Sequence, residues 1–343
     1  MEKPKGILTV TGMIDFGQFW PDGVSDADTA KILVKVSGAS SFSFQKAPGA
    51  PAKPTNAFAG AFMKGSGGVD PKTGKVRKPK FVINSKSQIT ARYQGIDAPE
   101  LHFKPPHGRI NLRQYFGELS AIALTAFLKT FGAGPLPCRV VTRVNKPNEV
   151  FDKYGRFVGD ILIKKGNKEI NVNHWLVQQG WAFPSFYDSM LDKEIRDLIA
   201  VAEQARKKTR NIWGKNDYTP DLGQLDRRLT TRKVHSAPAP DTGAVIIPKF
   251  FRRQYTWAVD VDRGASTAKN LKQFLLAPRN KDKFMMTDAF LNSIKQNLPK
   301  PPMIKLGNAI DGANRVIHAP KDFVNHEAPS TLVHGNNVPV TGW

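Results

Sequence analysis

Apolar residues recur along the first 214 residues in a pattern that predicts five β-strands. Apolar and β-branched residues dominate 5–14 and 29–36, and they return in 81–96, 138–144 and 156–163. Such runs, bounded by Gly, Pro, Asn and Asp, are typical of strands. Because these segments do not alternate one by one with helices, the pattern favours a five-stranded barrel over a parallel sheet.

Three further segments have apolar residues at helical spacing. They predict helices over 112–130, 171–180 and 189–210, with Ser189 as the N-cap of the last one. The first helix is expected to bury one apolar stripe. The residues of that stripe are Leu119, Ile122, Leu124, Phe127 and Leu128.

Two regions depart from this pattern. Residues 37–80 are crowded with Gly, Ser, Ala, Pro and Lys, which indicates a long insertion between the second and third strands. Residues 215–244 have the composition of a linker, and apolar clusters return in 245–343. We therefore expect a first domain over 1–214 and a C-terminal domain of unknown mixed fold, whose function the sequence does not identify.

The charge of the chain restricts its partners. With 51 Lys and Arg against 29 Asp and Glu, the net charge is +22, which indicates a polyanionic partner such as nucleic acid or an anionic membrane surface.

The composition excludes several classes of protein. A hydrophobic content of 40% excludes global disorder. We see neither a membrane-spanning run nor a signal peptide, so the expected location is the cytoplasm, with leaderless export as an alternative. Cys138 is the only cysteine, which excludes intramolecular disulfides and a Cys-based zinc site.

Three short polar motifs lie where predicted strands begin or end. One follows the third strand, one precedes the second strand, and one forms the turn between the fourth and fifth strands. Taken singly, each is typical of a solvated turn, and about one in five such matches would be functional. The residues are Arg92, Asp97, Ala98 and Glu100 in RYQGIDAPE, Asp26 and Asp28 in SDADT, and Lys153, Tyr154 and Arg156 in DKYGR.

In this order and on this strand pattern, the motifs resemble the staphylococcal-nuclease-like (thermonuclease) family. The resemblance covers about residues 6–214 apart from the insertion. It includes the segment from Asn173 to Gly180 and the ending Asn211-Ile-Trp-Gly214. It implies an α+β fold with a five-stranded OB-type β-barrel and three helices, a fold that commonly binds nucleic acid. No family is recognised for residues 215–343.

The resemblance also implies a metal site. Asp28 and Asp97 would supply carboxylates to a Ca²⁺ ion, or to another divalent cation, and the backbone carbonyl of Ala98 would be a third ligand. Asp26 would orient metal-bound water without touching the ion. The family has Thr at the position of Ala98, and a main-chain ligand tolerates that change. It has Gly at the position of Ala27, which would be strained if the site needed a positive φ there.

The resemblance further implies phosphodiester hydrolysis. Glu100 would act as general base, and Arg92 and Arg156 would stabilise the phosphoryl transition state. The substrate-binding residues would be Lys153, Tyr154 and Tyr187. The predicted activity is that of a metal-dependent, thermonuclease-like phosphodiesterase of endonuclease type. It would act on DNA, with RNA as a second candidate substrate and with little sequence specificity.

The sequence leaves alternative functions open. The same barrel can serve as a non-catalytic nucleic-acid-binding or scaffold module. Binding to an anionic membrane has little support, because no basic helix has a strong apolar face. Two histidines, His102 and His107, lack a third zinc ligand nearby and are expected to be loop residues.

The C-terminal region interleaves basic and aromatic residues. This pattern suits stacking on single strands, and it also suits an amphipathic packing face, which we favour. The region would bind nucleic acid, a protein partner or a second copy of the chain, and the sequence leaves the oligomeric state open. The residues are Lys249, Arg252 and Arg253 beside Phe250, Phe251, Tyr255 and Trp257.

Overall fold

The fold is taken from a computed structural model of the chain. Apart from Lys215, the predicted linker at 215–244 lies outside the described residues. The structure describes residues 5–34, 41–69, 74–108, 111–145, 147–215, 245–326 and 331–340.

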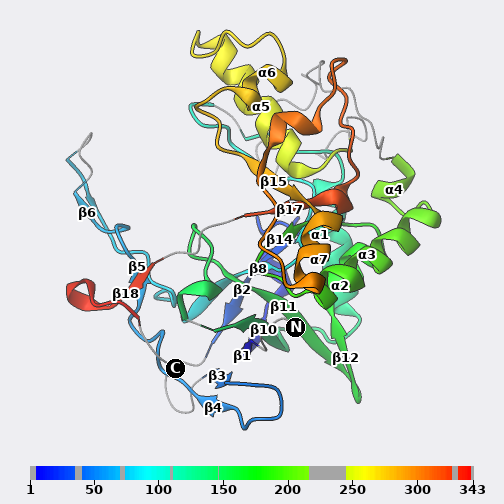
Figure 1. The fold of residues 1–343 in the computed structure, drawn as a ribbon. Helices are drawn as coiled ribbons and strands as arrows, with labels where there is room; N and C mark the ends of the chain where they lie inside the picture. The colour runs from blue at the N-terminus through cyan, green and yellow to red at the C-terminus, as the bar shows by residue number, and fades with distance from the viewer. Residues whose placement is uncertain are drawn as a thin grey trace.

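Five strands close into a β-barrel, as the apolar pattern predicts (Figure 1). Around the barrel the order is β10-β11-β8-β2-β1, and β1 closes it by pairing with β10 along its whole length. Only the β8–β11 pair is parallel. The predicted OB-type α+β fold is therefore confirmed. The strands are β1 (Gly6–Ile14), β2 (Thr29–Leu33), β8 (Gln88–Tyr93), β10 (Leu136–Val144) and β11 (Phe157–Lys165).

Short elements connect and extend the barrel. β12 (Lys168–Asn171) pairs with β11, and β9 (Ile96–Asp97) pairs with β13 (Phe183–Pro184). β14 (Phe186–Tyr187) follows directly. Two 3-10 helices cover Phe16–Gln18 and Pro147–Val150.

Helices pack against the barrel, and two details differ from the sequence-based expectation. Leu124 and Leu128 of the predicted stripe are buried, but Leu119 and Ile122 are 42% and 43% exposed, because α1 turns Ala121 inward beside them. The third predicted helix begins after Leu191 and not after Ser189. The helices are α1 (Gly117–Lys129), α2 (Val172–Gln178), α3 (Asp192–Lys207) and α4 (Ile212–Lys215).

The start of α3 has a physical reason. The backbone N–H of Leu191 donates a 2.9 Å hydrogen bond to the Glu194 carboxylate, which reaches back along the first turn of the helix. A carboxylate there is favourable because the N–H groups of the first turn lack partners within the helix. Ser189 is therefore not the N-cap.

The insertion forms small strands that attach to both ends of the chain. β3 pairs with β1, and β5 pairs with β18 (Leu332–Val333) near the C-terminus. Phe58 is buried between Phe42 and Phe151, with ring centroids 5.1 and 5.4 Å away. These contacts hold the described part of the insertion on the barrel. Its strands are β3 (Phe42–Gln45), β4 (Lys53–Pro54), β5 (Phe62–Met63), β6 (Gly68–Val69) and β7 (Val76–Arg77).

The C-terminal region lies directly on the first domain, above the barrel in Figure 1. Its strands form a sheet of order β14-β17-β15-β16, so β14 of the first domain belongs to that sheet. Val324 and Phe290 are part of the same apolar cluster as the barrel residues. None of the described helices has the length and apolar character needed to cross a membrane. The elements are α5 (Pro248–Asp262), α6 (Leu271–Leu276), β15 (Lys283–Met286), α7 (Thr287–Gln296), β16 (Ile304–Lys305) and β17 (Phe323–Asn325), with short 3-10 turns at Leu306–Ala309, Pro320–Asp322 and Gly335–Asn337.

Candidate active site

One pocket of about 450 Å³ lies between the barrel and the C-terminal region. Strand pairing brings the motifs together there, because Thr29 of β2 lies opposite Arg92 of β8, and β8 runs beside β11. All the site residues predicted from the sequence line this pocket, while their roles stay predictions. They are Asp26, Asp28, Arg92, Asp97, Ala98, Glu100, Lys153, Tyr154, Arg156 and Tyr187.

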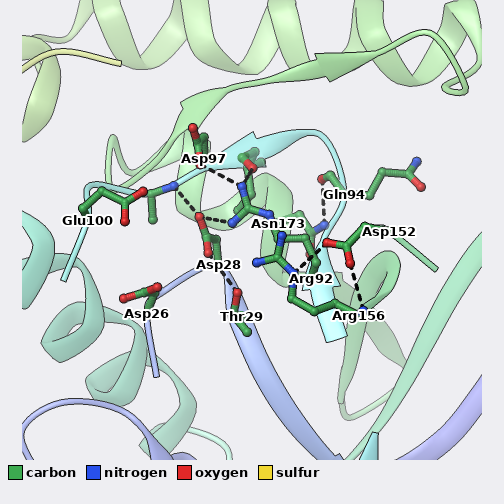
Figure 2. Close-up of polar contacts among 12 residues, drawn as sticks. Asp26, Asp28, Thr29, Arg92, Gln94, Asp97, Glu100, Asp152, Arg156 and Asn173 are labelled. Carbon is green, nitrogen blue, oxygen red and sulfur yellow. Dashed lines mark hydrogen bonds and ion pairs between the residues drawn. The ribbon is translucent and has the colours of Figure 1, made fainter. Parts of the chain in front are cut away.

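Arg92 lies at the centre of the polar contacts (Figure 2). Its Nη2 donates to Asp97 Oδ1 at 2.7 Å and to the carbonyl of Ile96 at 3.1 Å, and its Nη1 contacts Asp28 Oδ2. Burial opposes the charged form, but the two carboxylates outweigh it and hold the pKa of Arg92 well above its ordinary value. Arg92 is therefore a fixed cation between two acids.

Asp28 is buried at the entry to β2. Its Oδ2 accepts the Ala98 N–H at 2.7 Å, and its Oδ1 accepts the Thr29 hydroxyl at 3.2 Å. Burial alone would raise the pKa of Asp28, but the charge and hydrogen bond of Arg92 and the bond from the Ala98 N–H lower it overall. Ala27 does not have a positive φ, so replacing the family's Gly causes no backbone strain here.

Asp152 orients Arg156, and sequence reasoning did not select it. Its Oδ1 accepts the N–H groups of Tyr154 and Arg156, each at 2.9 Å, and its Oδ2 accepts Arg156 Nε at 2.7 Å. Gly155 has φ +73°, and the Met63 side chain of the insertion fills the space where a Cβ would lie. The signal was present, because Asp at the first position of a turn commonly bonds N–H groups ahead of it.

Glu100 is held from two sides. Its backbone N–H donates to Gln114 Oε1 at 3.2 Å, and its carboxylate contacts the guanidinium of Arg252. Burial and three neighbouring aspartates raise the pKa of Glu100 to about 7, against the opposing charge of Arg252. A carboxyl group with such a pKa exchanges protons readily at neutral pH.

Comparison with known proteins agrees with this geometry. The sequence model of the staphylococcal nuclease homologue family matches residues 90–215. Over this segment the chain is similar to that family. The match contains Arg92, Asp97, Glu100 and Arg156, and it supports a nuclease or a nucleic-acid-binding module. A search of curated proteins finds no match for the chain.

The first domain does not form its pocket alone. Arg252 of α5 contacts Glu100, and its Nη2 lies 3.3 Å from Asp97 Oδ2. Lys249 and Arg253 of the same helix also line the pocket, whereas none of the described residues of the insertion does. Sequence reasoning noted these basic residues but did not place them at the site, because 152 positions separate Arg252 from Glu100.

The predicted aromatic packing face of α5 is confirmed. The side chains of Phe250, Phe251, Tyr255 and Trp257 are buried in a second apolar cluster of the molecule. The same cluster contains Leu112, from the loop that precedes α1. The aromatic residues therefore dock the helix, while Phe250 and the three basic residues of α5 line the pocket.

The donor chemistry of the pocket fits a hard divalent cation. Asp26, Asp28, Asp97 and Glu100 present carboxylate oxygens, the ligands that Ca²⁺ and Mg²⁺ prefer. Within the described parts of the chain, however, no three acidic, His or Cys side chains are grouped as in a metal site. The acids bind arginines instead, and Asp26 Oδ1 lies 3.2 Å from His102 Nδ1. Metal binding thus remains a prediction.

Proposed function

We propose that the chain is a divalent-cation-dependent nuclease, with Ca²⁺ as the first candidate, that hydrolyses DNA and RNA with little sequence preference. The observation that carries this proposal is that Asp28, Arg92, Asp97, Glu100 and Arg156 line one pocket. The family match and the net charge of +22 support a nucleic-acid substrate.

The two arginines would bind the phosphate that is cut. Phosphodiester hydrolysis adds negative charge to a group that is already anionic, so the site must supply positive charge. Arg92 is held by Asp97 and Asp28, and Arg156 by Asp152, so both guanidiniums are oriented before substrate arrives. Such orientation lowers the cost of binding the transition state, because the charges need not reorganise.

Glu100 would take the proton from the attacking water. At neutral pH a carboxyl group with a pKa of about 7 is partly ionised, which suits a general base. Gln114 keeps the Glu100 backbone in place through its 3.2 Å hydrogen bond. Asp28, Asp97 and the Ala98 carbonyl would hold the cation, which when bound supplies further positive charge for the phosphate.

The direct test is cleavage by the purified full-length protein. Plasmid DNA, a single-stranded oligonucleotide and RNA are each incubated with Ca²⁺, Mg²⁺, Mn²⁺ or EDTA. We expect cleavage with a divalent cation and none with EDTA. Absence of cleavage with every cation would refute the enzymatic proposal.

Two substitutions test the assigned roles. Glu100→Gln and Arg156→Ala should each lower kcat by about 10²- to 10⁴-fold while leaving the melting temperature nearly unchanged. Matched controls are Glu169→Gln and Arg139→Ala, which remove the partners of an exposed ion pair outside the pocket. Near-wild-type rates for Glu100→Gln would remove its role as general base.

A non-catalytic nucleic-acid-binding module is the second candidate. The observation that favours it is the contact of Arg252 with Glu100 and Asp97, which neutralises acids that the chemistry requires. Salt-dependent DNA binding without hydrolysis by any cation would support this reading.

A further inference from the structure

Helix α5 presents three basic side chains to the pocket. Lys249, Arg252 and Arg253 are spaced by three and four residues, so they lie on one face of the helix. The aromatic residues between them are buried in the second apolar cluster, which anchors the helix. The position of these three cations is therefore set by packing.

The two arginines already have carboxylate partners. Arg252 contacts Glu100 and Asp97, and Arg253 Nη2 lies 2.9 Å from Asp282 Oδ1. Each guanidinium is thereby neutralised where it lies.

Lys249 differs from them. Its Nζ donates a 2.5 Å hydrogen bond to the side-chain oxygen of Asn325, which is a neutral group. Within the described part of the chain, no carboxylate lies within ion-pair distance of this Nζ. An ammonium group withdrawn from water and lacking an anion is unfavourable. Burial, with the like charges of Arg253 and Arg252, lowers the pKa of Lys249 to about 8, although Asp282 opposes the shift.

The partner of Lys249 is itself held in place. Asn325 lies on β17, and its Nδ2 donates to the carbonyl of Phe186 at 3.1 Å. Phe186 belongs to β14, directly before the pocket residue Tyr187. Lys249 is thus directed into the pocket by a fixed acceptor, and two of its three N–H donors remain for a ligand.

We propose that Lys249 binds a phosphate of the nucleic-acid strand other than the one that is cut, so that α5 forms the second wall of the substrate pocket. This inference rests on the proposed function, because it takes nucleic acid as the ligand. An anion supplied by the substrate provides the counter-charge that Lys249 lacks. The pocket volume of about 450 Å³ is in the range of sites for single small ligands. A nucleotide of an unpaired strand matches the size of the pocket, and we expect an unpaired strand to bind more tightly than a base-paired one.

Binding measurements without cleavage test this inference. A 5′-labelled eight-residue thymidine oligonucleotide is titrated with the full-length protein in EDTA, and fluorescence anisotropy is followed over a series of salt concentrations. We expect Lys249→Ala to bind about tenfold more weakly. The negative slope of log affinity against log salt should become shallower by about 0.7, as expected for the loss of one phosphate contact with a single strand.

Controls separate a local contact from the general field of the protein. Lys295→Ala removes the same charge from an exposed position on α7 outside the pocket, and it should bind within about twofold of wild type. Lys249→Arg should retain most of the affinity. If Lys249→Ala does not fold, Lys249→Met, which keeps the chain length without the charge, is measured instead. A duplex of equal length should bind more weakly than the single strand.

The outcomes distinguish this inference from the proposed function. If Lys249→Ala matches Lys295→Ala in affinity and slope, the phosphate contact does not exist. Tighter binding or faster cleavage by Lys249→Ala would show that α5 obstructs the pocket, and it too would overturn the inference. Equal affinity for the duplex would overturn the preference for an unpaired strand. Binding that depends on Lys249 in a protein that cuts nothing would refute only the nuclease activity.

Discussion

Gln114 connects the loop of Glu100 to the C-terminal region, and its replacement is the sharpest test of that connection. It is fully buried, its Oε1 accepts the Glu100 N–H at 3.2 Å, and its Nε2 donates to the Ile246 carbonyl at 2.6 Å. Ile246 lies just before α5. Gln114→Leu keeps the approximate volume of the side chain and removes both hydrogen bonds.

The expected loss of stability follows from the two groups left behind. A buried backbone N–H and a buried carbonyl would each lose a partner, at a cost of about 1 to 3 kcal/mol per group. The free energy of unfolding should therefore fall by about 2 to 6 kcal/mol, a large share of the 5 to 15 kcal/mol typical of folded proteins.

Urea unfolding of the full-length protein measures this loss. The matched control is Gln204→Leu on α3, where the side chain is exposed and the change should stay within about 0.5 kcal/mol. Because the same amide positions Glu100, kcat should also fall in the variant that still folds. A loss of stability below about 1 kcal/mol would refute the reasoning, since it would mean that both groups find other partners.

Two further predictions concern buried acids. Asp152→Asn keeps an acceptor for the backbone but removes the charge that orients Arg156, so kcat/KM for oligonucleotide cleavage should fall about tenfold or more; an unchanged value would show that Arg156 needs no such partner. Burial, and then the charge of Glu194, raise the pKa of Asp160 to about 7, above its value of about 3.9 in the unfolded chain. Ionisation therefore opposes folding, and the stability present below about pH 4 is lost as the pH rises to about 7. Asp160→Asn keeps the 3.0 Å bond from Asn173 and should reduce this loss in thermal melts at pH 4.5 and 7.5, where the raised pKa of Glu100 still contributes; a loss equal to that of the wild type would exclude Asp160 as a source.

The sequence by itself determined the barrel and the residues that its three polar motifs contribute to the pocket. Strand alternation is a local property with a period of two residues, so each barrel strand is visible in a short window of the chain. The pocket motifs are equally local, because Asp97 ends β9 and Glu100 follows it by three residues. Local signals of this kind need no knowledge of distant contacts.

The sequence alone does not determine which face of a helix is buried. Leu119 and Ile122 have the spacing of a buried stripe, yet they are exposed on α1. Their apolar character alone does not say which side of the helix meets the barrel. That choice depends on the packing of the helix against residues far away in the chain.

Only the tertiary structure decided what closes the pocket. The pocket is lined by Lys249, Arg252 and Arg253 of the C-terminal region, which the sequence alone does not place there. No local pattern links Arg252 to Glu100 across 152 positions, because their contact depends on how the aromatic face of α5 docks on the first domain. Asp97 and Glu100 lie far from α5 along the chain, and long-range packing brings their carboxylates into contact with Arg252.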